Sequence, residues 1–210
     1  MTAFLIVLAV AAEAYLLGSV DTGILVSKYL YHDDVRTHGS GAAGMTNMLR
    51  TFGKKAAALT AVGDVLKGVV AVCLGRWLFG HLPADAAVSP YLGVYLAAIL
   101  AVVGHSRPIY FGFKGGKGVS STCGVMLMTF WWQALICYVI TIALIAITKF
   151  VSLGSLALVV LFGILVTATN WGNWLVIAWV WVIAGLCIYR HHANIGRLIH
   201  GTERKIGQKA

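Results

Sequence analysis

The chain has 210 residues, of which 60% are hydrophobic and only 11% are charged. Soluble domains carry about twice that charged fraction, so the composition excludes an ordinary soluble protein and indicates one polytopic membrane domain over residues 1–210. The net charge of +9 does not indicate a nucleic-acid partner, because Lys and Arg collect on the cytoplasmic loops of membrane proteins and no basic stripe with stacking aromatics lies outside the apolar runs.

Six apolar runs follow one another along the chain, at 3–28, 53–79, 90–108, 119–147, 152–169 and 173–190. Five of them suit a single membrane-spanning helix of about 20 residues. The first lacks the basic start of a signal peptide, so we expect a retained span. The fourth is too long for one helix, because about 29 residues would reach roughly 43 Å against a hydrocarbon core of about 30 Å.

The distribution of Lys and Arg decides how the run 119–147 crosses the membrane. If it turns near 130–133 it forms two short helices, and all the basic segments then share one side. The opposite loops, near 80–90, 130–133 and 170–173, contain no Lys or Arg. By the positive-inside rule we predict an all-α integral membrane protein with seven transmembrane helices, its N-terminus outside and its C-terminus cytoplasmic.

Three polar segments, 38–50, 104–118 and 190–205, interrupt the apolar runs. Each combines glycines with Arg or Lys and with hydroxyl, amide or imidazole side chains. Glycine lets backbone N–H groups approach an anion closely, and the cations neutralise it. On the seven-span topology all three segments lie at the cytoplasmic surface, so we expect them to form one anion site.

In the first segment, Ser40 lies between two glycines and precedes Thr46, Asn47 and Arg50. Ser40 is a candidate to bind a phosphoryl oxygen or to act as a nucleophile. Taken alone, the better interpretation is that Ser40 or Thr46 caps a helix that begins near Gly53 or earlier. No GxSxG motif occurs, so a lipase-type triad has no support.

In the second segment, Lys114 and Lys117 flank Gly115 and Gly116 just before a predicted helix. The P-loop pattern GxxxxGK[ST] fails in its spacing and in the residue after the lysine, which argues against an NTPase. A helix N-terminus beside two cations is nonetheless a seat for phosphate. The alternative interpretation is a basic cytoplasmic loop with a glycine turn.

In the third segment, His191 and Asn194 have the i, i+3 spacing of one helical face, and His192 points elsewhere. His191 is a candidate general base or phosphate ligand, although a histidine at the interface often only forms a hydrogen bond there. Glu203 is the only acid of the basic tail. We expect it to pair with a neighbouring arginine.

Asp64 and Lys67 lie at i, i+3 within the apolar run 53–79. Ionisable groups are costly inside a membrane and are usually paired or functional. We predict that the two residues pair with each other and support the site, with a proton relay as the alternative. The histidines are scattered and form no HExxH motif, so we predict no metal and no cofactor.

Six features recur in this order along the chain: YLLGSVDTGILVSK, GSGAAGMTNMLR, the triplet of Asp64, Lys67 and Gly68, GHSRP with FGFKGGKGV, FVSLGS, and RHHANIGRLIHGTERK. Together they resemble the bacterial acyl-phosphate:glycerol-3-phosphate acyltransferases of the PlsY type over nearly the whole chain. Two positions depart from the family's pattern. Ala42 stands where the family usually has Asn, and Arg107 where it usually has an aromatic residue.

The resemblance implies a multi-pass enzyme of the bacterial cytoplasmic (inner) membrane that moves a fatty acyl group from acyl phosphate to the sn-1 hydroxyl of glycerol 3-phosphate. The products would be lysophosphatidic acid and inorganic phosphate, in the first acylation step of phospholipid biosynthesis. Its implied partners are the two substrates, membrane lipid and the soluble enzyme that makes acyl phosphate. An acyl-CoA-dependent enzyme is disfavoured, because no histidine starts an HxxxxD pattern. An anion or phosphate-compound transporter remains the alternative.

Such a transfer requires two bound phosphates, an oriented hydroxyl and stabilisation of developing charge. No cysteine and no triad serine is poised as a nucleophile, so we expect direct attack by the hydroxyl, with His191 or a substrate phosphate as base. The candidate catalytic residues are His191, Asn194 and Ser40. The candidate phosphate-binding residues are Arg50, Lys114, Gly115, Gly116, Lys117, Thr46, Asn47, Ser152 and Ser155, and the structural supports are Asp64, Lys67 and Glu203.

Overall fold

A computed structural model describes residues 2–82, 89 and 91–208, so the predicted outer loop near 80–90 lies largely outside the described residues. Within the described residues every regular element is helical, which confirms the all-α prediction. The helices are α1 (Thr2–Ser19), α2 (Thr22–Tyr31), α3 (Met45–Phe52), α4 (Lys54–Phe79), α5 (Tyr91–Ser106), α6 (Val119–Thr129), α7 (Trp131–Thr148), α8 (Val151–Thr169), α9 (Trp174–Arg190) and α10 (His192–Ile199), with 3-10 turns at Val35–Thr37 and Ile109–Phe111.

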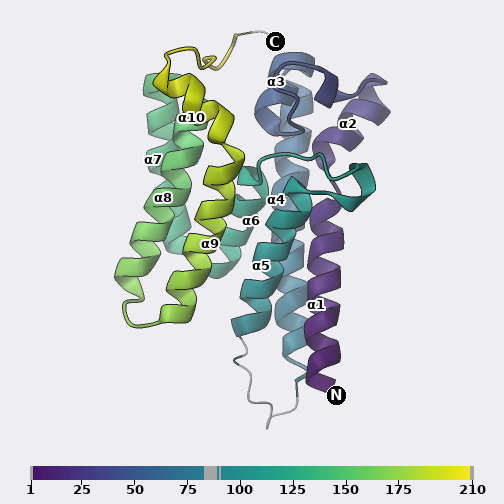
Figure 1. Cartoon of the computed structure of the whole chain (residues 1–210), viewed down its shortest axis with the longest axis vertical. Coiled ribbons are helices and arrows are strands. Elements are labelled where there is room, and N and C mark those ends of the chain that lie inside the picture. The colour runs from purple at the N-terminus through teal and green to yellow at the C-terminus, as the bar shows by residue number, and fades with distance from the viewer. Residues whose placement is uncertain (1, 83–88, 90, 209–210) are drawn as a thin grey trace.

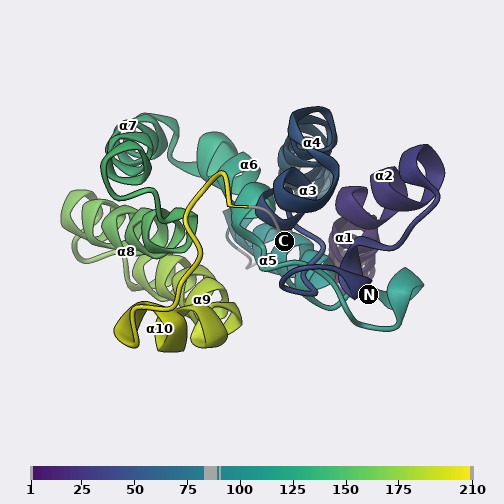
Figure 2. The same ribbon diagram turned by 90° about the horizontal axis from the view of Figure 1, so that it is seen from above.

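The long helices run along one axis in two groups (Figure 1). Helices α1, α4 and α5 lie on one side, α7, α8 and α9 on the other, and α6 lies between them. The short helices α2, α3 and α10 gather at the end that carries the C-terminus, and the N-terminus lies at the opposite end. Seen from above, the C-terminal segment crosses this end from α10 towards α3 (Figure 2). The three polar segments therefore meet at one end of the molecule.

Five helical stretches of the described chain are long and apolar enough to cross a membrane, and the bent pair of α9 and α10 is a sixth if it counts as one span. Helix α6 is apolar but has only 11 residues. Helix α7 exposes Val139, Ile142 and Ile147, as expected for a helix that faces lipid. These features indicate a multi-pass membrane protein.

The run 119–147 divides into two helices, as predicted. The break is at Phe130, where the backbone leaves the helical region with φ −138° and ψ 69°. Trp131 and Trp132 lie one step beyond the break and already belong to α7. The two helices are therefore unequal, with 11 and 18 residues instead of about 14 each.

The first run, expected as one helix over 3–28, remains a single candidate span over Ala3–Tyr31, but it is divided into two helices. Helix α1 ends at Ser19, and Asp21 starts α2 because its carboxylate accepts a hydrogen bond from the N–H of Ile24 at 3.2 Å. A hydrophobicity pattern does not show that a polar residue within an apolar run caps a helix.

The capping interpretation of the first polar segment was wrong. Helix α3 begins at Met45 after Gly44, and no side chain forms a capping hydrogen bond there. Ser40 lies in the loop before the helix, and Thr46 lies in its first turn. Neither hydroxyl is needed to start a helix, so both remain free for another role.

Glycines allow the backbones of α4 and α6 to come into direct contact. A Cβ at Gly68 would lie 2.4 Å from the carbonyl oxygen of Ser121, and a Cβ at Gly124 would lie 2.1 Å from that of Val65. Small residues at such contacts are typical of helices in lipid, where close packing drives association. The contact holds the Asp64 turn of α4 beside the start of α6.

Candidate active site

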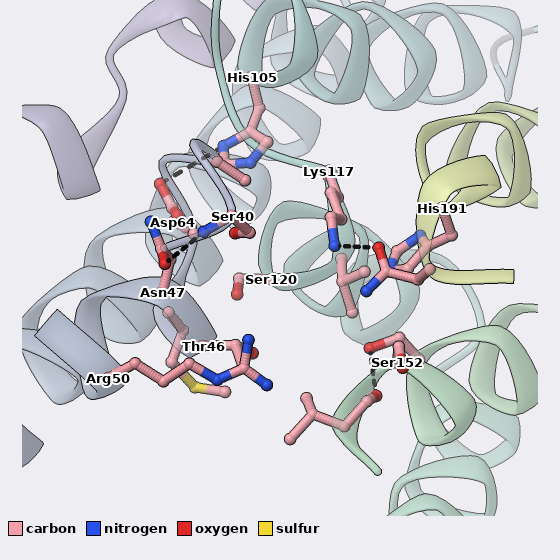
Figure 3. A pocket seen from close by; sticks show the side chains of 18 of the residues that line it. Ser40, Thr46, Asn47, Arg50, Asp64, His105, Lys117, Ser120, Ser152 and His191 are labelled. Carbon is pink, nitrogen blue, oxygen red and sulfur yellow. Dashed lines mark hydrogen bonds and ion pairs between the residues drawn. The ribbon is translucent and has the colours of Figure 1, made fainter. Parts of the chain in front are cut away.

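A cavity of about 90 Å³ lies where the three polar segments meet α4 and α8 (Figure 3). Four predicted site residues are not part of its lining: Lys67, Lys114, Gly115 and Gly116. The other predicted site residues do line it, and they are Ser40, Thr46, Asn47, Arg50, Asp64, Lys117, Ser152, Ser155, His191, Asn194 and Glu203.

His191 lies at the joint between α9 and α10, whose axes differ by 62°. The two helices are not continuous, but His191 caps α10 and Asn194 lies three residues further along that helix. As predicted, His191 and Asn194 both lie buried at the cavity, while His192 is exposed.

The hydrogen bond of His191 determines its tautomer. Nδ1 lies 2.7 Å from the carbonyl oxygen of Cys187, which can only accept, so Nδ1 donates its proton. Burial lowers the pKa of His191 to about 4, and the nearby charge of Lys117 acts in the same direction. The ring is therefore neutral at pH 7, and Nε2 is left as an acceptor.

Glu203 ties the third segment together, as predicted. Its Oε2 accepts a hydrogen bond from Nε of Arg197 at 2.7 Å, and its Oε1 accepts from Nδ2 of Asn194 at 2.7 Å and from Oγ of Ser152 at 2.8 Å. Burial opposes the charge, but these hydrogen bonds hold the pKa of Glu203 below its usual value. The amide oxygen of Asn194 in turn accepts from Nζ of Lys117. This network positions Lys117 at the cavity.

Arg50 and Lys117 supply positive charge to the cavity. Nη2 of Arg50 donates to the carbonyl oxygen of Arg204 at 3.0 Å, whereas its buried Nε has no partner among the described residues. Burial lowers the pKa of Lys117 to about 8, and nearby arginines add to the effect. In the described chain, the carboxylates that line the cavity are paired elsewhere, Asp64 with Lys67 and Glu203 with Arg197. The charges of Arg50 and Lys117 are thus available to an anion.

Asn47 shapes the loop before α3. Its Oδ1 accepts from the N–H of Ser40 at 3.1 Å, and its Nδ2 donates to the carbonyl oxygens of Val35 and His38 at 3.1 and 3.0 Å. The amide is occupied by the loop, so Asn47 positions Ser40. The hydroxyls of Ser40 and Thr46 form no side-chain hydrogen bond within the described chain and are free for a substrate.

The glycine pair does not form the phosphate cradle predicted for it. Gly115 and Gly116 are buried outside the cavity, and their carbonyl oxygens accept from Arg190 at 3.3 and 3.0 Å. A Cβ at Gly116 would lie 2.1 Å from Nε2 of His105. The pair therefore lets the loop pack against His105. Lys114 is exposed and does not reach the cavity.

His105 is the main site residue that we did not predict. It is buried, and its Nδ1 accepts from Nζ of Lys67 at 2.9 Å. Lys67 also contacts Asp64 at 2.9 Å, which confirms the predicted pair. The sequence did hold a signal for His105, because it lies near the end of the apolar run 90–108. We assigned the role of the segment that follows to Gly115 and Gly116 instead. Ser120, in the first turn of α6, lines the cavity and was also missed.

The two residues that depart from the family pattern, Ala42 and Arg107, lie in different parts of the structure. Ala42 lines the cavity, so the missing amide bears on substrate contacts. Arg107 is exposed and is not part of the lining.

Comparison with known proteins identifies the family. The model of the family described as glycerol-3-phosphate acyltransferase matches residues 7–201. The chain is 44% identical over 200 residues to the glycerol-3-phosphate acyltransferase of Clostridioides difficile (strain 630), covering 95% of each chain. It is similar to the crystal structure of PlsY, an integral membrane glycerol 3-phosphate acyltransferase, in its glycerol 3-phosphate form, with a TM-score of 0.85, 33% identity and 96% coverage of both chains. The lysophosphatidic acid form matches with a TM-score of 0.82 and 31% identity. The chain therefore belongs to the glycerol-3-phosphate acyltransferase family and is an acyltransferase of the PlsY type.

Proposed function

We propose that the chain transfers a fatty acyl group from acyl phosphate to the sn-1 hydroxyl of glycerol 3-phosphate. Lysophosphatidic acid and inorganic phosphate are the products. The observation that carries the proposal is the pair of cations, Arg50 and Lys117, in a cavity whose carboxylates are neutralised by other residues. The related PlsY structures, one in a glycerol 3-phosphate form and one in a lysophosphatidic acid form, support this acceptor and this product.

In the proposed reaction the sn-1 hydroxyl oxygen bonds to the acyl carbonyl carbon, and the bond from that carbon to the phosphate oxygen breaks. Phosphate leaves with the electron pair, and the hydroxyl proton passes to an acceptor. Arg50 and Lys117 offset the charge of the two phosphate groups. Nε2 of His191 can only accept, so it is suited to orient the hydroxyl rather than to bind a phosphate dianion.

Transfer from acyl phosphate needs no covalent enzyme intermediate, because phosphate is already a good leaving group. The Cys187 thiol lies in α9 and is not part of the lining of the cavity, so it is not placed to act as a nucleophile. Two groups remain as proton acceptors, Nε2 of His191 and an oxygen of the substrate phosphate. The dependence of activity on pH in the unmodified protein and in His191→Ala distinguishes them.

The direct test is phosphate release from palmitoyl phosphate by the purified protein, with and without glycerol 3-phosphate. We expect release to depend on glycerol 3-phosphate and to be matched by lysophosphatidic acid, measured by mass spectrometry. Palmitoyl-CoA in place of palmitoyl phosphate should give no product. Uptake of glycerol 3-phosphate into proteoliposomes without acylation would instead support the transporter alternative and would refute the proposal.

We further propose seven spans in the bacterial cytoplasmic membrane, with the N-terminus outside and the site at the cytoplasmic surface. The one-sided distribution of Lys and Arg supports this topology. Arg76 is an exception, near the outer end of α4, where its Nη2 donates to the carbonyl oxygen of Met128 at 2.9 Å and so satisfies the end of α6. A site at this surface would receive glycerol 3-phosphate, and acyl phosphate from the soluble enzyme that makes it, while the acyl chain stays in lipid.

The topology predicts that residues 132 and 205 lie on opposite sides of the membrane. In a Cys73→Ser background, we expect Trp132→Cys in intact cells to react with an impermeant maleimide. Lys205→Cys should react only after the membrane is opened. Labelling of both positions from the same side would refute the seven-span topology.

The pKa of Lys117 predicts an alkaline limit on activity. Because burial lowers this pKa to about 8, the ammonium is charged below pH 8 and increasingly neutral above it. We therefore expect kcat/KM for glycerol 3-phosphate, which reports the free enzyme, to fall above about pH 8. Lys117→Arg keeps its charge at high pH, so its profile, scaled to its own maximum, should stay flat there. An unchanged alkaline limb in this variant would assign it to another group.

A further inference from the structure

Asp64 combines complete burial with an unsatisfied oxygen. Its Oδ1 accepts from Nζ of Lys67 at 2.9 Å and lies 3.4 Å from the backbone nitrogen of Thr22. Its Oδ2 has no hydrogen-bond partner in the described chain, and the side chain is 0% exposed. An unpaired acceptor of this kind is costly, because its interactions with water are lost on burial. Asp64 nevertheless lines the cavity (Figure 3).

Lys67 and His105 do not relieve this oxygen. The ammonium of Lys67 uses its three protons on Oδ1 of Asp64, on the carbonyl oxygen of Val20 at 2.8 Å and on Nδ1 of His105 at 2.9 Å. His105 presents an acceptor to Lys67, and its Nδ1 lies 3.6 Å from Oδ1 of Asp64, not from Oδ2. Of these three side chains, only Asp64 therefore keeps an acceptor without a partner in the described chain.

The chemistry of the cavity restricts what this oxygen can bind. Arg50 and Lys117 supply the positive charge that phosphate requires, whereas a carboxylate oxygen repels phosphate. The remaining polar parts of glycerol 3-phosphate are its two hydroxyls, and both can donate. The sn-1 hydroxyl must give up its proton during transfer, and an aspartate already bound to an ammonium is a poor acceptor for a full proton. The C2 hydroxyl keeps its proton throughout the reaction.

We infer that Oδ2 of Asp64 accepts a hydrogen bond from the C2 hydroxyl of glycerol 3-phosphate and so selects acceptors that carry this hydroxyl. The inference rests on the proposed function. It makes Asp64 a substrate-binding residue in addition to the partner of Lys67, and it makes Lys67 and His105 the groups that position the carboxylate.

The test compares glycerol 3-phosphate with 3-hydroxypropyl phosphate, which lacks only the C2 hydroxyl. For the unmodified protein we expect kcat/KM to be about 10- to 100-fold higher with glycerol 3-phosphate, the range for a hydrogen bond to a charged group. Asp64→Asn should lower kcat/KM for glycerol 3-phosphate selectively, so that the ratio falls towards one. A structural role alone would lower both substrates equally, and that outcome would overturn the inference.

Asp21 offers a matched control. Its Oδ2 is also buried and unpartnered within the described residues, but Asp21 does not line the cavity. Asparagine caps a helix as well as aspartate does, so Asp21→Asn should keep the start of α2. We expect it to keep the substrate ratio of the unmodified protein. If Asp21→Asn lowered the ratio as much as Asp64→Asn, the effect would come from the charge of the cluster and the inference would be wrong.

A second variant covers the case in which Asp64→Asn does not fold. Asp64→Leu combined with Lys67→Met replaces the buried ion pair with apolar side chains of similar size, a change that proteins often tolerate. Its ratio should also approach one. A ratio near one in the unmodified protein would overturn the inference while leaving the proposed function intact. Failure to acylate either substrate would instead refute the proposed function, and the inference with it.

Discussion

Replacing Lys117 with alanine is expected to lower kcat/KM for glycerol 3-phosphate by at least about tenfold, because it removes a charge-assisted phosphate contact worth about 1.5–3 kcal/mol. Arg50→Ala should have a comparable effect for the same reason. Both side chains line the cavity, and neither forms an ion pair within the described residues. The measurement is steady-state kinetics in detergent, with thermal melting to show that each variant folds.

Lys114 is the matched control for this prediction. It lies in the same loop, three residues before Lys117, but it is exposed and outside the cavity. Lys114→Ala should therefore stay within about twofold of the unmodified protein, as is usual for exposed surface positions. Equal losses at both lysines would mean that the loop acts through its total charge. Near-normal turnover in Lys117→Ala and Arg50→Ala would mean that these residues only direct topology.

Replacing His191 with alanine is expected to lower kcat by about 100-fold, the lower end of the range for a side chain that handles the reacting proton. The imidazole is buried at the cavity, and its Nδ1–H is used by the carbonyl oxygen of Cys187, so Nε2 is the acceptor that the variant loses. His192→Ala is the control. Its side chain is exposed, and its Nδ1 lies 2.9 Å from the carbonyl oxygen of Tyr189, so we expect near-normal activity.

The pH profile then identifies the proton acceptor. With a pKa near 4, His191 acting as the base should give a rise in activity centred near pH 4 that is lost in His191→Ala, and no change around pH 6.5. Substrate phosphates titrate near pH 6, and we expect any change there to persist in His191→Ala. A rise near pH 6.5 that disappears in the variant would contradict this, because it would assign an ordinary histidine pKa to a ring that the fold keeps neutral.

Much of the fold could be predicted from the sequence because its determinants are local. Membrane insertion depends on the length and polarity of each run, so the positions of α4, α5, α8 and α9 followed from the pattern. The break in 119–147 followed from length, because one helix would overshoot the membrane. The break at Asp21 did not, because it depends on a buried capping carboxylate within a run that is otherwise apolar.

The site divides in the same way. Asp64 and Lys67 could be paired from sequence because i, i+3 neighbours on a helix meet wherever the helix lies. Lys114 and Lys117 could not be told apart, since a loop has no periodicity to say which side chain faces inward. The role of Gly116 could not be predicted either, because it depends on the close approach of the His105 ring from α5.

The sequence by itself thus determined that the chain is an all-helical membrane protein, and it predicted an anion site in the glycine-rich, basic segments, because composition and residue type set those properties. Only the tertiary structure decided which of those residues reach the cavity. Lys117 lines the cavity and Lys114 does not, His105 belongs to the site, and α10 bends away from α9 at His191. One oxygen of Asp64 has no partner among the residues that the structure describes. Each of these depends on the packing of helices distant in sequence, and no local pattern records that packing.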